Sequence, residues 1–277
     1  MKKAVHLGGF FYLCIMKELL VRTVSGAVLV AVIVACVLLS PWSMAALSLF
    51  IVVVGTYEMG RLQHIEGAWH MVVGELMAVG AFLAVALWVL LKLPTFLMVV
   101  PFALLPFLLA LFSKTNDFRS IAAFTFGSMA FLSLPCALMV WMHQFFSPKM
   151  VLLVFVLLWV NDTFAYLTGR LLGKHKLFER ISPGKTIEGS IGGLVFTMVG
   201  VIVFSHYTSW LSMTEAVGMG LIAVVFGTLG DLCESMLKRQ AGVKDSGKLI
   251  PGHGGILDRF DSVLFAIPFV FVYLLLV

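Results

Sequence analysis

Residues 23–40 read TVSGAVLVAVIVACVLLS, a stretch without a single charged side chain. A helix needs about 20 mostly apolar residues to cross the hydrocarbon core of a bilayer. Apolar runs of similar length recur at roughly 43–60, 69–91, 94–113, 120–143, 150–171, 188–208, 214–237 and 258–277. The pattern predicts an all-α polytopic membrane helical bundle of about nine transmembrane helices. It excludes a membrane β-barrel, whose strands are alternating segments of about ten residues.

The composition agrees with this prediction. Of 277 residues, 61% are hydrophobic and 12% are charged, and the mean hydropathy is +1.07. Soluble domains are about 45–50% apolar and about 25% charged, so an ordinary soluble enzyme and a disordered chain are both excluded. The formal net charge of +5 is small for a nucleic-acid binder, and we expect no nucleic-acid partner. The four cysteines form no CxxC pair, which argues against a zinc site or a disulfide framework.

The first fifteen residues imitate a signal peptide, with Lys2 and Lys3 before an apolar stretch. They contain His6 and no A-x-A-like cleavage site, so we expect a short cytoplasmic or interfacial lead-in. Met16 is an alternative start of translation.

The basic residues indicate the orientation. With nine spans, 17 of the 19 Lys and Arg residues fall on the side of the N-terminus, and Lys92 and Lys149 fall on the other. Cytoplasmic loops carry the excess of Lys and Arg. We therefore expect a cytoplasmic N-terminus and a C-terminus across the membrane.

The acidic residues divide the chain. Nine of the 14 lie at or after Asp162. Residues 1–150 are therefore interpreted as a scaffold of about five spans. Residues 151–277 are interpreted as the catalytic region, with hydrophilic cytoplasmic loops at about 172–187 and 238–257.

The first polar cluster lies at the end of the eighth predicted span. Asp231, Glu234, Ser235 and Lys238 are spaced so that they share one helix face, and Arg239 follows them. A carboxylate in an apolar helix is costly and usually faces a polar cavity or a partner. The alternative for Glu234 is a simple salt bridge with Lys238 at the helix end.

The second cluster is the glycine-rich loop between residues 244 and 261. Glycines let backbone N–H groups approach an anion closely, and Lys244 and Arg259 add positive charge for phosphate. Asp258 and Asp261 are three residues apart and can face one side, which suits Mg²⁺. The alternative is an ordinary basic loop with a glycine turn.

The third cluster has two parts. Asp162 lies in the middle of a predicted span, where a charge indicates function by default. Gly184-Lys185-Thr186 looks like the end of a P-loop, but Glu179 stands where that motif needs glycine. Ser182-Pro183 instead predicts the start of the seventh helix, with Lys185 and the helix dipole able to hold a phosphate. The alternative is a helix cap with a snorkelling lysine.

Two other acids lie in the first half. Glu58 and Arg61 are three residues apart at a span end and are interpreted as an interfacial ion pair. Glu75 is interpreted as a buried polar contact. Together the clusters of the second half indicate phosphoryl chemistry between a water-soluble and a lipid-borne substrate.

The segment from Ser235 to Asp261 reads S-x-L-K-R-x₄-K-D-x-G-x₂-I-P-x-H-G-G-I-x-D-R-F-D. This segment resembles the signature of the phosphatidate cytidylyltransferase (CDP-diacylglycerol synthase) family, and none of its 27 residues departs from that pattern. The stretches 162–166 and 182–189 are also similar to that family, and the resemblance covers about 157–262.

The resemblance implies that CTP and phosphatidic acid give CDP-diacylglycerol and pyrophosphate. It implies Mg²⁺, with Mn²⁺ as a substitute and a monovalent cation such as K⁺ beside it, on Asp231 and Asp258, with Asp261 and Glu234 as further ligands. It also implies a homodimer in a bacterial inner membrane. The residues expected to act on the reacting groups are Asp231, Asp258, Lys238, Arg239, Lys244, Arg259 and Asp261. The residues expected to bind substrate are Lys185, Ser182, Glu188, Asp162, Asp245, His253, Gly254 and Gly255.

Two other classes of membrane protein are alternatives. An ion-coupled transporter would use Asp162, Asp231 and Asp258 as a cation pathway, but it does not explain the loops suited to phosphate. A CDP-alcohol phosphotransferase would need the motif D-G-x₂-A-R followed by G-x₃-D-x₃-D, which the sequence lacks.

Overall fold

The computed structural model describes residues 2–99, 101, 104, 107, 111, 118–208 and 210–277, and of residues 2–15, 17 and 18 the backbone alone. Within this part of the chain, eight helices are long and apolar enough to cross a membrane. They are α1 (Lys2–Leu39), α2 (Pro41–Leu62), α3 (Ala68–Leu91), the continuous run of α5 (Phe118–Ser128), η2 (Met129–Ser133) and α6 (Leu134–Phe145), α7 (Pro148–Leu172), α8 (Ile187–Tyr207), α9 (Met213–Gln240) and α10 (Leu257–Leu276). The predicted all-α bundle is confirmed.

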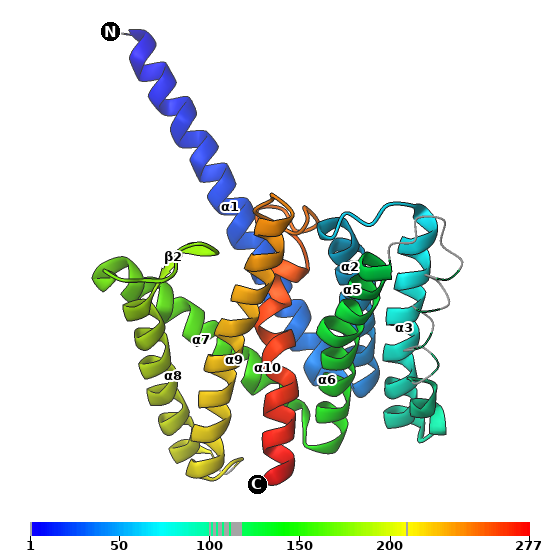
Figure 1. Cartoon of the computed structure of the whole chain (residues 1–277). Helices are drawn as coiled ribbons and strands as arrows, with labels where there is room; N and C mark the ends of the chain where they lie inside the picture. Colours follow the sequence, from blue (N-terminus) through cyan, green and yellow to red (C-terminus); the bar gives the residue numbers. More distant parts are fainter. Residues whose placement is uncertain are drawn as a thin grey trace.

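Eight of the nine predicted spans coincide with these helices. The predicted span 94–113 lies largely outside the described residues, although Pro94–Met98 form the short 3₁₀ helix η1. The count of nine therefore stays a prediction. The backbone of α1 continues through the predicted lead-in to Lys2 and projects beyond the bundle (Figure 1). Its cytoplasmic or interfacial location stays a prediction.

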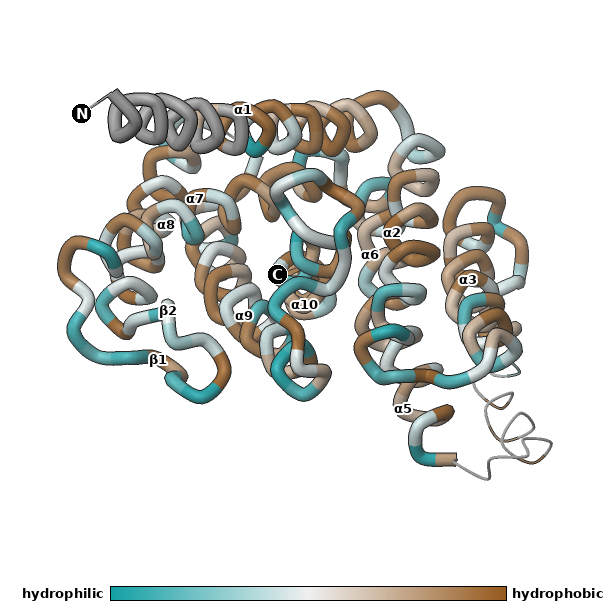
Figure 2. The backbone as a smooth tube through the Cα atoms, turned by 90° about the horizontal axis from the view of Figure 1, so that it is seen from above, coloured by the Kyte–Doolittle hydropathy of each residue, from teal (hydrophilic) through white to brown (hydrophobic). Residues whose placement is uncertain are grey.

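Helix α10 lies at the centre of the bundle. It packs most extensively against α9 and also contacts α2, α6 and α7, and the view from above places it between these helices (Figure 2). Leu257, Phe260, Leu264 and Ile267 are almost completely buried along it. Burial of apolar side chains on several sides fixes the direction of α10, and its first turn carries Asp258 and Asp261.

The hydrophilic segment before α8 folds as a small antiparallel hairpin of β1 (Lys176–Phe178) and β2 (Ser182–Thr186), in which Lys176 pairs with Thr186. The prediction that Ser182 starts the helix is therefore wrong. The backbone of residues 182–186 is extended and paired, and Thr186 is the N-cap, accepting a hydrogen bond from Gly189 N at 3.1 Å.

The hydrophilic segment before α10 is shorter than predicted. Helix α9 continues to Gln240, so Lys238 and Arg239 lie in its last turn. The negative C-terminal end of the helix dipole favours cations there. This segment and the hairpin lie at the same end of the bundle (Figure 1). That end is called the hydrophilic end below. Which end faces the cytoplasm stays a prediction.

Candidate functional site

A cavity of about 760 Å³ opens at the hydrophilic end, between α1, α7, β2, α9 and α10. It brings together most of the predicted site residues. Those that line it are Asp162, Ser182, Lys185, Asp231, Lys238, Arg239, Lys244, Asp245, His253, Asp258, Arg259 and Asp261. The other four, Glu188, Glu234, Gly254 and Gly255, do not line it.

Lys238 joins the two halves of the signature segment. Its ammonium group pairs with Glu234, one turn earlier on α9, and with Asp258 Oδ1 on α10 at 2.6 Å. The Glu234–Lys238 salt bridge considered from the sequence is therefore present. It is not at an exposed helix end, because Glu234 is 0% exposed and Lys238 is 9% exposed. Three charged groups thus form one buried network across the α9–α10 contact.

Asp258 closes the base of the loop that precedes α10. Its Oδ2 accepts hydrogen bonds from Gly255 N and Ser246 N, both at 2.8 Å, and lies 2.9 Å from Ser246 Oγ. Gly254 has a φ of 85°, and a Cβ there would lie 2.6 Å from the same oxygen, so the loop needs glycine to wrap this carboxylate. Both oxygens of Asp258 are therefore occupied by donors of the protein.

Asp231 lines the same cavity from α9. Its Oδ2 pairs with Lys185 Nζ at 2.5 Å, and its Oδ1 accepts a hydrogen bond from Ser235 Oγ at 3.1 Å. Strand β2 supplies Lys185, so the hairpin delivers this cation to α9. The predicted sharing of one face by Asp231 and Ser235 is confirmed.

Asp162 and Asp261 add two carboxyl groups to the lining of the cavity. Both lie within electrostatic reach of Asp231. Asp162 is 3.4 Å from Asn161 Nδ2, and Asp261 accepts from Ser262 N at 2.6 Å. Neither carboxylate forms a salt bridge within the described residues. In the same part of the chain, no group of three or more His, Cys, Asp or Glu side chains is already placed to hold a metal ion. Two carboxylates without a salt bridge are a donor set that fits a hard divalent cation.

The cations of the cavity differ in what they already bind. Arg239 donates from Nε to Ile181 O at 3.2 Å and from a terminal nitrogen to Val243 O at 3.0 Å, so it ties the hairpin to the end of α9. Lys244 and Arg259 line the cavity and form no salt bridge in the described part of the chain. These two are therefore available to an anionic ligand.

His253 contacts α1. Its Nδ1 lies 2.9 Å from Ser25 Oγ, which also donates to Pro251 O at 2.9 Å. The imidazole thus ties the glycine-rich loop to the first helix.

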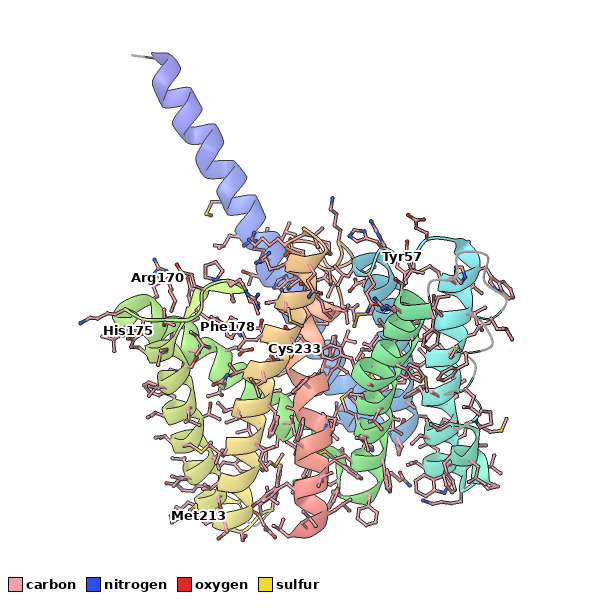
Figure 3. All side chains as sticks on the ribbon, viewed as in Figure 1. Tyr57, Arg170, His175, Phe178, Met213 and Cys233 are labelled. Atoms are coloured by element: carbon pink, nitrogen blue, oxygen red, sulfur yellow. The ribbon has the colours of Figure 1, made fainter. Side chains whose placement is uncertain are left out.

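Glu188 does not line the cavity, although its neighbours Thr186 and Gly189 do. It accepts hydrogen bonds from the backbone of Lys174 at 3.0 Å and of His175, and it contacts His175 Nδ1 at 2.6 Å. His175 lies at the outer edge of the hydrophilic end, beside Arg170 and Phe178 (Figure 3). Glu188 therefore fixes the turn that leads into the hairpin.

One wall of the cavity is apolar. Leu29, Val30 and Ile33 of α1 line it together with Phe155 and Trp159 of α7. Only 11% of the membrane-spanning part of α1 is buried in the bundle. The cavity thus combines carboxylates, cations and an apolar wall, and one helix of that wall, α1, is mostly uncovered by the rest of the bundle.

Sequence reasoning misjudged Glu58. No salt bridge of Glu58 is found among the described residues, so the interpretation as an interfacial pair with Arg61 is wrong. Glu58 is 4% exposed and accepts hydrogen bonds from Ile256 N and Leu257 N. The only feature of the sequence that could have indicated this role is a carboxylate near the end of an apolar run.

The comparisons with known proteins agree with this geometry. Part of the chain is similar to curated relatives named phosphatidate cytidylyltransferase. The relative from Staphylococcus haemolyticus is 49% identical over 126 residues, which are 45% of this chain and 48% of the relative. The relative from Staphylococcus aureus is 48% identical over the same length. The relative from Staphylococcus epidermidis is 46% identical over 132 residues, 46% of this chain and 49% of the relative.

These matches span about half the length of the curated relatives. The match to a family is longer and takes in α2 to α10 with the whole cavity. Because residues 20–277 match the cytidylyltransferase family, the chain belongs to that family.

Proposed function

We propose that this membrane protein transfers the cytidylyl group of CTP to phosphatidic acid, forming CDP-diacylglycerol and pyrophosphate. An oxygen of the lipid phosphate attacks the α-phosphorus of CTP, and the bond from that phosphorus to the oxygen that bridges to the β-phosphate breaks. Pyrophosphate leaves with the bond's electrons. Family membership and the printed name of the relatives support this reaction.

The observation that carries the proposal is the two-sided cavity. Its hydrophilic side has cations for phosphates, and its apolar wall on α1 and α7 suits acyl chains. A phosphate monoester is mostly dianionic at pH 7, since its second pKa is about 6. The attacking oxygen therefore needs no strong base, and the main task is to bring two polyanions together.

Each group of the cavity has a role in this reaction. Lys244 and Arg259 bind phosphate oxygens, because they have no salt-bridge partner in the described residues. Lys185 neutralises charge beside Asp231. Mg²⁺, or Mn²⁺ in its place, would supply positive charge that stabilises the leaving pyrophosphate.

The metal ligands that we propose are Asp231 and Asp261, with Asp162 close by. Lysines already pair with Asp231 and Asp258, so either carboxylate would hold the ion through an oxygen that Lys185 or Lys238 releases. Glu234 fits less well, because it is buried against Lys238 and does not line the cavity.

The proposal includes a cytoplasmic hydrophilic end in a bacterial membrane. The excess of Lys and Arg at that end supports it. A homodimer is proposed on the resemblance alone.

The test is pyrophosphate release by the purified full chain in detergent with CTP, phosphatidic acid and Mg²⁺. Asp231→Asn removes a proposed ligand and the partner of Lys185. We expect activity to fall by roughly 100-fold or more, as for the loss of a group that stabilises transition-state charge. Glu179→Gln, an exposed acid in the hairpin turn, makes the same change of charge and should leave activity unaltered.

Diacylglycerol in place of phosphatidic acid should give no release. Release without lipid phosphate, or no release from well-folded protein with any divalent cation, would overturn the proposal. The second result would turn attention to the ion-coupled transporter and to measurements of ion flux.

A further inference from the structure

Glu58 lies in the scaffold half, yet it contacts the loop of the signature segment. It is near the end of α2, and the groups that it binds are almost 200 positions later in the chain. Its Oε1 accepts from Ile256 N at 3.0 Å. Its Oε2 accepts from Leu257 N at 2.9 Å and lies 2.9 Å from Ser246 Oγ. A carboxylate is thus held at the N-terminal end of α10, where backbone N–H groups favour negative charge.

The glycines of the loop fit around this carboxylate. A Cβ at Gly247 would lie 2.3 Å from Glu58 Oε1, and a Cβ at Gly255 would lie 2.4 Å from it. Real Cβ atoms essentially never come so close to another heavy atom. The backbone therefore reaches Glu58 only because these two positions have no side chain.

Glu58 and Asp258 bind neighbouring groups of the same loop. Asp258 binds Ser246 N and Gly255 N, while Glu58 binds the next two amides, of Ile256 and Leu257. Ser246 Oγ lies 2.9 Å from both carboxylates. A hydroxyl has one proton, so it donates to one of them at a time. The two acids together close the base of the loop 246–255.

We propose that Glu58 is a positioning residue, which sets the loop 246–255 and the first turn of α10 from the scaffold half of the chain. It does not line the cavity and touches no substrate. It acts through the loop that carries His253 and through the turn that carries Asp258 and Arg259. The effect on activity rests on the proposed function, whereas the effect on the loop does not.

Glu58→Gln tests this role with little change in size. The amide nitrogen of glutamine cannot accept a hydrogen bond, so one of the contacts to Leu257 N and Ile256 N is lost and the charge is removed. Hydrogen exchange followed by mass spectrometry reads the loop directly in the full chain. We expect amides of residues 246–257 to exchange roughly tenfold faster or more, because hydrogen bonds to charged groups are the stronger ones.

The activity assay separates positioning from folding. We expect kcat for pyrophosphate release to fall roughly 10- to 100-fold, with smaller changes in KM, because a misplaced group affects the reacting geometry most. Glu58→Asp keeps the charge on a shorter side chain and should recover part of the loss. Glu66→Gln, an exposed acid at the same end of the bundle, is the matched control and should behave as the unchanged protein.

Ser246→Ala provides a second line of test. If Glu58 acts through the loop, the effects of Glu58→Gln and Ser246→Ala on kcat should be less than additive in the double variant. Unchanged exchange in 246–257 and unchanged kcat at an unchanged melting temperature would overturn the inference. Faster exchange throughout the protein, with kcat per folded molecule unaltered, would overturn it as well.

The two proposals can fail separately. If the unsubstituted protein releases no pyrophosphate, but Glu58→Gln still exchanges faster in the loop alone, the role of Glu58 is sustained and the proposed function is overturned.

Discussion

Replacement of Lys238 by methionine is expected to destabilise the protein strongly. The substitution keeps most of the length of the side chain and removes the ammonium group between Glu234 and Asp258. Glu234 then has no described partner while it stays 0% exposed. An unpaired buried charge is among the few causes of large destabilisation by a single substitution.

The magnitude follows from the burial of the network. The side chains of Lys238, Glu234 and Asp258 are 11%, 1% and 3% exposed, so solvent screens their interaction little. Two unit charges about 4 Å apart attract by about 4 kcal/mol at an effective dielectric constant of about 20. The cost of desolvating Lys238 offsets part of this attraction, and loss of one partner from a buried pair typically costs about 3–5 kcal/mol. We expect a loss of this size in the free energy of unfolding.

Tryptophan fluorescence across a denaturant series in detergent micelles measures this loss. Trp159, which lines the cavity, reports on the region. The control is Lys174→Met, because Lys174 is exposed at the hairpin and should change stability by less than about 0.5 kcal/mol. Glu234→Gln, added to Lys238→Met, removes the stranded charge and should recover part of the loss. A Lys238→Met protein as stable as the control variant, with no recovery in the double variant, would refute the reasoning.

Two further predictions concern α1. Ser25→Ala removes the contacts of its hydroxyl with His253 Nδ1 and Pro251 O, and kcat/KM for CTP should fall roughly tenfold, as for one or two neutral hydrogen bonds. Equal kinetics in the two proteins would show that this contact does not affect the reaction. Val30→Trp places a large ring on the apolar wall of the cavity and should raise KM for phosphatidic acid while KM for CTP changes little. Val32→Trp on the exposed side of α1 is its control, and an equal rise in KM there would contradict the assignment of the wall.

The membrane bundle could be predicted because it depends on local properties. The length and uniform polarity of each apolar run determine that a segment crosses the bilayer. Helical spacing is also local, which is why the Asp231–Ser235 and Glu234–Lys238 contacts could be predicted within one helix.

Contacts between distant segments could not be predicted in this way. Nothing near Glu58 in the sequence indicates that Ile256 N is its donor. The partners of Lys238 illustrate the same limit, since Glu234 is one turn away but Asp258 belongs to another helix. The hairpin was missed because its strands are short and its residues polar, without the alternation that marks a half-buried strand.

The contact of α1 and α2 with the loop 246–255 has a consequence for the construction of chimeras between members of this family. A boundary near residue 150 looks convenient, because it separates plain apolar helices from the conspicuous motif. A chimera joined there would pair one parent's Ser25 and Glu58 with another parent's loop. Such hybrids should retain activity only when both parents carry interchangeable residues at these contacts. The unit that can be exchanged between homologues therefore includes α1 and α2, together with the segment from α7 to α10.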